Sequence, residues 1–375
     1  MVGHAPCRFR RTANRATGRL LPQVLIATGL LVGVTRPAVG TVVPQVFRVD
    51  LPVSRLAAGV PEAEIRRAAR VLLDRITGDP DLAARGSVNG LLAESSQWVA
   101  EYGYKKMPGR LKGRGDTSRS PFRLWIRFGH RAVERAVLGA HLPFWGELRP
   151  LLLVWLDAGS QSREILSASS PSPLRRHLER TLHRLALPAL LPVMDLRERL
   201  QIRGGSLSPP AWPLLRKVSK KYRPEALWVG RLTGSPAGGW LGVFALRIGH
   251  FTLDWKSQRP HVHRQNALQS AVDHLDSILA SRYAVFAEHE PVRLSIRIRG
   301  RLTLRRISRL EHFFRHLPGV TQAHLRELAS KSLTFTVLSR IDRTHLRRLM
   351  ALAGPGITLK PETEHGHRLV FALQP

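Results

Sequence analysis

Cysteine is almost absent from this chain. Its 375 residues contain one cysteine, Cys7, which lies in an N-terminal segment that we expect to be cleaved off. The remaining chain would then have no disulfide, no thiolate metal site and no cysteine nucleophile. Stability must come from packing, and a hydrophobic share of 43% is ordinary for chains that bury real cores.

Carboxylates are scarce as well. The chain has 27 Asp and Glu against 59 Lys and Arg, which gives a net charge of +32. Only nine of the 59 are lysines, a skew that a GC-rich genome could produce, but codon bias does not explain the missing carboxylates. The imbalance indicates acidic surroundings or partners. The alternative is a solvated basic face in a protein adapted to an acidic exterior.

Common catalytic motifs are also missing from the sequence. It has no Walker loop, no dinucleotide glycine fingerprint after a strand, no Gly-x-Ser-x-Gly elbow, no Ser-x-x-Lys pair and no His-Glu-x-x-His helix. We therefore expect no enzymatic activity, no catalytic residue and no cofactor.

The first 40 residues have the pattern of a signal peptide. Five arginines without a carboxylate precede an apolar run at residues 24–34, which is shorter than the roughly 20 residues that cross a bilayer. Small residues, Ala38 and Gly40, stand at positions −3 and −1 of a cleavage site before Thr41. We expect export to the periplasm, which would lower the net charge by six to +26 and leave no transmembrane span. The alternative is an uncleaved membrane anchor.

We expect the remaining chain to divide into an N-terminal unit at residues 41–149, a central module at 150–288 and a C-terminal unit at 289–375. In the first unit, apolar spacing predicts strands at 43–51, 98–104 and 122–128, helices at 61–76 and 131–140, and an extra short helix near 88–94. The order is β-α-β-β-α.

Continuous apolar runs in the central module predict strands that are buried on both faces. They occupy residues 151–156, 189–194 and 226–232 and alternate with helices at 173–187 and 212–222, so we expect parallel neighbours in one sheet. A hairpin at 240–255 and a helix at 267–283 complete the module.

The C-terminal unit has the order β-α-β-β-α-β. Strands are predicted at residues 292–299, 320–328, 332–339 and 368–373, with helices at 304–316 and 344–352. The predicted class is α/β in the broad α+β sense: a mixed, mostly parallel central sheet flanked by ferredoxin-like units.

Four separated strings resemble the bacterial proteins that carry domain of unknown function 2066 (DUF2066). They are LPFWG at 142–146, RPLLLVWL at 149–156, LPVMDL at 191–196 and ALWVGRL at 226–232. The similar region runs from about Val46 to Tyr283. Gly129 departs from the pattern, since the family has Asp after the Phe there, and the basic loop at 107–120 is unusual. The resemblance implies export and an envelope setting, without an activity or catalytic residues.

The order of the central module is also similar to the amino-terminal module of the periplasmic Tol-system protein and to curli-secretion lipoproteins. This likeness is one of topology alone.

Three polar residues, Asp157, Asp195 and Arg231, follow or end the predicted central strands. The carboxyl ends of parallel strands are where open α/β sheets bind ligands, so these residues are candidates for binding a ligand or partner. The alternative is structural: Asp195 caps a turn, Asp157 starts a loop, and Arg231 pairs with a neighbouring carboxylate.

Two histidine pairs have the spacing of metal ligands, His261 with His263 and His365 with His367. Neither pair has a third ligand in view, so solvated histidines are favoured and we expect no metal site.

Basic stretches at 105–119, 216–223 and 297–309 could bind phosphates. Export disfavours nucleic acid as the partner and favours anionic lipid or polysaccharide of the envelope. The glycine-rich first stretch is the best candidate for binding an anionic surface, through Lys105, Lys106, Arg110, Lys112, Arg114 and Arg119.

The first hypothesis is therefore an exported envelope protein that binds an envelope protein or an anionic surface without catalysis. The second is a ligand-binding protein or hydrolase that uses the edge at Asp157, Asp195 and Arg231. The third is a nucleic-acid-binding protein whose N-terminus is not a signal.

Overall fold

The computed structural model describes residues 41–79, 82, 88–107, 121–159, 165–202, 207–236, 238–286, 290–352, 359–365 and 368–373. It is a mixed α/β structure, as predicted. The described residues all fall in one compact unit, and the division of the chain after residue 40 into three units stays a prediction. The expected signal peptide lies outside the described residues.

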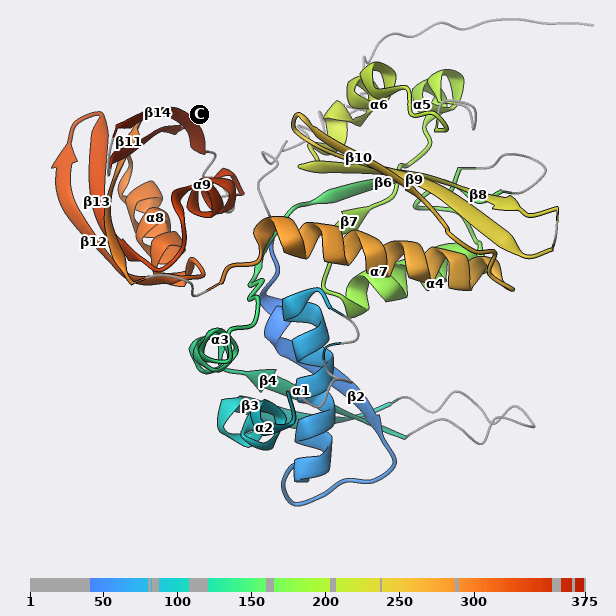
Figure 1. The fold of residues 1–375 in the computed structure, drawn as a ribbon, viewed down its shortest axis with the longest axis horizontal. Helices are drawn as coiled ribbons and strands as arrows, with labels where there is room; N and C mark the ends of the chain where they lie inside the picture. The colour runs from blue at the N-terminus through green and yellow to red at the C-terminus, as the bar shows by residue number, and fades with distance from the viewer. Residues whose placement is uncertain are drawn as a thin grey trace, which may run out of the picture. The chain divides into compact units, whose positions relative to one another are not determined.

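A three-stranded antiparallel sheet, in the order β2-β4-β3, is formed by the first part of the described chain (Figure 1). The predicted order of elements is confirmed, including the extra short helix. Helix α1 buries one apolar face and ends at Gly78, whose φ of 66° suits glycine. The elements are β2 (Arg48–Val53), α1 (Glu62–Thr77), α2 (Asn89–Ala93), β3 (Val99–Lys106), β4 (Phe122–Phe128) and α3 (His130–Gly139).

The strand predicted at residues 43–51 is interrupted. Thr41–Val42 form β1, which pairs with β5 (Leu148–Arg149), and Pro44–Phe47 form a 3-10 helix before β2 begins. Pro44 occupies the first position of this helix, where its missing N–H costs nothing.

The central sheet has the order β10-β9-β8-β6-β7. Strand β6 pairs in parallel with both β7 and β8, which confirms that the three apolar runs are neighbouring strands. Strands β8, β9 and β10 then continue as antiparallel neighbours. The elements are β6 (Leu152–Asp157), α4 (Pro173–Arg184), β7 (Ala189–Leu190), α5 (Leu196–Gln201), α6 (Trp212–Ser219), β8 (Ala226–Gly234), β9 (Trp240–Ile248), β10 (Phe251–Lys256) and α7 (Arg264–Tyr283).

Both faces of β6 are covered, which explains its uninterrupted apolar sequence. Leu152, Val154 and Leu156 belong to the main core. Leu153 and Trp155 alternate with them and belong to a second core, to which α6 contributes. Figure 1 shows α5 and α6 on one side of this sheet and α4 and α7 on the other.

Strand β7 has two residues instead of the six predicted. Pro188 precedes the strand and Pro192 follows it, and neither can donate a hydrogen bond to a ladder. The run is also not buried as predicted, since Leu190 is 39% exposed and Val193 is 57% exposed.

The C-terminal sheet has the order β12-β13-β11-β15-β14. Strand β14 was not predicted, because its sequence LKPETEH lacks an apolar alternation; it is an edge strand with a register shift after Pro361. The likeness of the flanking parts to ferredoxin-like units, and of the central part to the Tol-system module, stays a prediction. The elements are β11 (Val292–Arg299), α8 (Leu304–His316), β12 (Val320–Ala329), β13 (Ser332–Ser339), α9 (Arg343–Ala351), β14 (Leu359–His365) and β15 (Arg368–Leu373).

Candidate functional site

Asp157 and Arg231 lie opposite each other on β6 and β8. Arg231 Nε lies 3.0 Å from Asp157 Oδ2, and the backbone N–H of Gly159 donates to Asp157 Oδ1 over 3.0 Å. Asp157 is only 2% exposed. Both carboxylate oxygens are therefore engaged within the protein, as the structural alternative for this pair expects.

Asp195 belongs to a different network. It is the N-cap of α5, forms a capping box with Glu198, and lies 2.6 Å from Lys221 Nζ. The hydrogen bond from Lys221 lowers the pKa of Asp195, and backbone N–H groups contribute to this shift. Tyr222 donates to Glu198 over 2.7 Å, so the network joins α5 to the 3-10 helix η6 (Lys220–Tyr222).

The structure thus brings Asp157 and Arg231 together and places Asp195 in a separate set of contacts. Each of the three has a structural task. That they bind a ligand or partner stays a prediction.

His261 and His263 gain no third metal ligand among the described residues. Within the described ranges, no group of three or more His, Cys, Asp and Glu side chains is arranged to hold a metal ion. His263 is the N-cap residue of α7, whereas His367 and the side chain of His365 lie outside what the structure describes.

The predicted anion-binding loop is described only at its start. Lys105 and Lys106 are exposed at the end of β3. Arg110, Lys112, Arg114 and Arg119 lie outside the described residues.

A second group of basic side chains lines a cleft of about 380 Å³ beside the start of β8. We call it the basic cleft; its cationic residues are Arg216, Lys220, Arg223 and Arg247. The first three come from α6, η6 and the turn after it, within the basic stretch 216–223 noted in the sequence. Arg247 comes from β9, and its guanidinium lies 5.7 Å from the ring centroid of Trp212. Sequence reasoning missed Arg247, because only the hairpin packing brings it to this cleft.

One carboxylate also lines the basic cleft. Glu225 accepts a hydrogen bond of 2.6 Å from the backbone N–H of Leu151, at the start of β6. Burial raises the pKa of Glu225, and the bond from Leu151 opposes that shift. Four cations therefore face one carboxylate that is already bound to the backbone, a charge balance that suits an anion.

The largest charge burial lies elsewhere, at Arg75, Arg149 and Asp276. Burial lowers the pKa of Arg149 to about 9, although Asp276 raises it. Burial also raises the pKa of Asp276 to about 7, although Arg149 and Arg75 lower it. Arg149 and Asp276 are 0% and 1% exposed. Charged residues closed to solvent in this way have a structural role.

No helix among the described residues is both long enough and apolar enough to span a membrane.

Comparison with solved structures gives only weak likenesses. A competence-damaged protein (CinA) superfamily protein from Enterobacter cloacae is 13% identical, with 47% of this chain and 98% of that chain covered and a TM-score of 0.22. Allophanate hydrolase from Kluyveromyces lactis is 9% identical, with 72% and 65% covered and a TM-score of 0.17. These scores are too low to indicate a shared fold. No curated protein matches the chain significantly.

The resemblance to DUF2066 is wrong. Two of its four strings contain the strands β6 and β8, whose residues are mostly buried. Such strings reflect burial on both faces, which any parallel α/β sheet imposes, and so they do not identify a family. The family model that matches this chain is a different one, a domain of unknown function (DUF8605), and its match covers residues 41–146.

Proposed function

We propose that this protein binds an anionic surface of the cell envelope and catalyses no reaction. The observation that supports this proposal is the basic cleft, where Arg216, Lys220, Arg223 and Arg247 converge on one space. Phosphate groups of lipid or polysaccharide match its charge. Cationic side chains near an anionic membrane each contribute on the order of 1 kcal/mol of binding free energy.

The overall charge favours the same conclusion. The full chain has a net charge of +32, and +26 would remain after signal cleavage. Such an excess of positive charge attracts anions, and the basic cleft brings four of the cationic side chains to one place. Asp157 and Arg231 are paired with each other, which favours a structural role for them over a catalytic one and so agrees with a protein that only binds.

Export is part of the proposal and rests on the sequence of the first 40 residues. N-terminal sequencing of protein recovered from the periplasm is expected to begin at or near Thr41, because Ala38 and Gly40 satisfy signal peptidase. An intact Met1 on a cytoplasmic product would contradict export, and nucleic acid would then become the favoured anionic partner.

The basic cleft is tested with vesicles of anionic phospholipid, with purely zwitterionic vesicles as the reference. Replacing Arg216, Lys220 and Arg247 with serine is expected to weaken binding to anionic vesicles by at least about tenfold at low salt, since three local charges are lost. Binding of the unaltered protein should also fall steeply as salt rises, because the Debye length is only about 8–10 Å near physiological salt.

A matched variant separates local from bulk charge. Arg70, Arg135 and Arg326 are exposed on α1, α3 and β12, and serine at these positions also removes three charges. This variant is expected to bind about as well as the unaltered protein. Equal weakening in both variants would mean that only the total charge matters, and the cleft would lose its assignment.

A further inference from the structure

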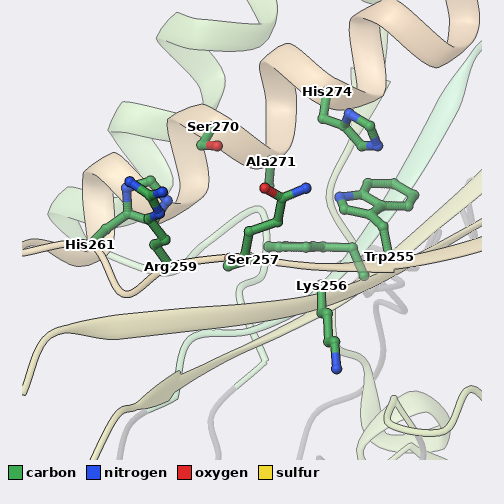
Figure 2. Close-up of a pocket in the computed structure, with 10 residues that line it drawn as sticks. Trp255, Lys256, Ser257, Arg259, His261, Ser270, Ala271 and His274 are labelled. Carbon is green, nitrogen blue, oxygen red and sulfur yellow. The ribbon is translucent and has the colours of Figure 1, made fainter. Parts of the chain in front are cut away.

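A second cavity, of about 510 Å³, lies between the end of β10 and helix α7 (Figure 2). This cavity differs from the basic cleft because aromatic rings form much of its wall. Arg259 and His261 lie together at one end of it. The residues that give it this character are Phe244, Trp255, Arg259, His261, Ser270 and His274.

The aromatic rings form a continuous series of contacts, in which the first two pairs are stacked and the last pair is edge-on. Ring centroids are 5.7 Å apart between Trp228 and Phe244, 5.7 Å between Phe244 and Trp255, and 5.4 Å between Trp255 and His274. Trp228 and Phe244 are buried in the central sheet. The rings that reach the cavity are therefore held by the core, and a ligand ring would find a preformed surface.

Two glycines make room for these rings. A Cβ on Gly230 would lie 2.5 Å from the ring of Phe244, and a Cβ on Gly242 would lie 2.3 Å from it. Gly230 is the direct cross-strand partner of Phe244. Any larger residue at either position would displace Phe244 and, through it, Trp255.

The polar segment that closes the cavity is tied to β9 at both ends. Ser257 and Gly242 exchange two hydrogen bonds, from Ser257 N to Gly242 O over 2.8 Å and from Gly242 N to Ser257 Oγ over 3.0 Å. Backbone bonds between His261 and Trp240 measure 2.8 Å and 2.7 Å. Arg259 and His261 therefore lie on a short segment that is anchored to β9 at both ends.

The charges lie at one end of the cavity. Figure 2 shows Arg259 and His261 together there, beside the first turns of α7, with Trp255 and His274 at the other end. Lys256 also lines the cavity, but Figure 2 shows its side chain pointing away from Arg259 and His261. No carboxylate stands among the described residues that line it. An anionic group would therefore be attracted toward Arg259.

The place of the cavity in the sheet also suits a ligand. Strand β10 runs parallel to β6 and β8, because β9 is antiparallel to both β8 and β10. The cavity therefore lies at the carboxyl ends of these strands, the edge where open α/β sheets bind ligands.

We propose that this cavity binds a small, planar aromatic molecule that carries an anionic group. The ring lies against Trp255 and His274, and the anion lies beside Arg259 and His261. This site is separate from the basic cleft and takes a different class of ligand, so it goes beyond the proposed function and does not depend on it.

Titration calorimetry of the full chain with 2-naphthalenesulfonate tests the proposal. Two further probes separate the parts of the ligand: naphthalene-2-methanol has the ring without the charge, and inorganic sulfate has the charge without the ring. The sulfonate is expected to bind at least tenfold more tightly than either. No measurable sulfonate binding, or sulfate binding as tight as sulfonate binding, would overturn the proposal.

Three variants assign the contacts. Arg259→Gln is expected to weaken sulfonate binding at least tenfold and to leave naphthalene-2-methanol unaffected. Arg70→Gln, the matched control at an exposed arginine on α1 outside the cavity, is expected to change neither. Trp255→Leu should weaken both aromatic probes, with circular dichroism used to check that the variant is folded. Equal weakening by Arg259→Gln and Arg70→Gln would place the ligand elsewhere, whether or not Trp255→Leu folds.

Discussion

Replacing Trp155 with alanine is expected to lower the free energy of unfolding by about 3–5 kcal/mol, the range for large-to-small changes in packed cores. Trp155 is 0% exposed in the middle of β6 and belongs to the second core, together with Leu153 and Leu215. Its indole N–H also donates to Ser219 Oγ on α6 over 3.1 Å. Alanine would leave a cavity between the sheet and α6 and would leave the Ser219 hydroxyl without this donor.

Urea unfolding followed by circular dichroism measures the effect. Val243→Ala on β9 is the control, because Val243 is 43% exposed on the same sheet, and its loss should stay below about 1 kcal/mol. Trp155→Phe should lie between the two, since it keeps most of the ring but loses the bond to Ser219. A loss below about 1 kcal/mol for Trp155→Ala would mean that α6 does not pack on this face.

Burial of Trp155 could be expected from sequence because the physical cause is local. A strand covered on both faces needs an unbroken apolar run, and Leu152–Asp157 provides one up to its last residue. The same holds for clear periodicity elsewhere: the predicted bounds of β11, α8, β13 and β15 agree with the structure. The apolar periodicity that predicts such an element lies within the element's own sequence.

Elements that depend on distant partners could not be predicted. Strand β14 has no apolar alternation and exists because β15 offers it an edge. The basic cleft needs Arg247 on β9 beside Arg216 on α6, and the aromatic cavity needs Gly230 and Gly242 to admit Phe244. Periodicity contains none of these relations, since each arises only when separate elements pack together.

Arg149 is the clearest example of a residue whose burial depends on contacts between separate elements. In the sequence it is one basic residue before a buried strand, yet it is 0% exposed. Its guanidinium donates to the backbone oxygens of Leu185 and Arg75, each over 2.7 Å, and it lies 4.0 Å from the ring centroid of Trp145. It thereby joins α1, the end of α4 and the segment before β6.

Replacing Arg149 with methionine is therefore expected to cost about 3–5 kcal/mol, although methionine fills much of the same volume. Each backbone oxygen left buried without its donor costs about 1–3 kcal/mol. Arg184→Met is the matched control: the Arg184 side chain is 54% exposed and pairs with Asp273 at 3.3 Å, so its loss should stay below about 1 kcal/mol. Similar losses in the two variants would contradict the role of Arg149.

The loss caused by Arg149→Met should also depend on pH, because Asp276 lies in the same buried group. Burial raises the pKa of Asp276 to about 7, and Arg149 is the main influence that lowers it. Without Arg149 this pKa rises further. A carboxyl with a raised native pKa binds more protons in the native than in the unfolded state, so stability falls as pH rises. Urea unfolding at pH 6 and pH 8 should therefore show a larger loss at pH 8. The loss for Arg184→Met should change less between the two pH values, because Arg184 lowers the pKa of Asp276 less than Arg149 does. An equal loss for Arg149→Met at the two pH values would show that Arg149 acts through its hydrogen bonds to the backbone and not through the charge of Asp276.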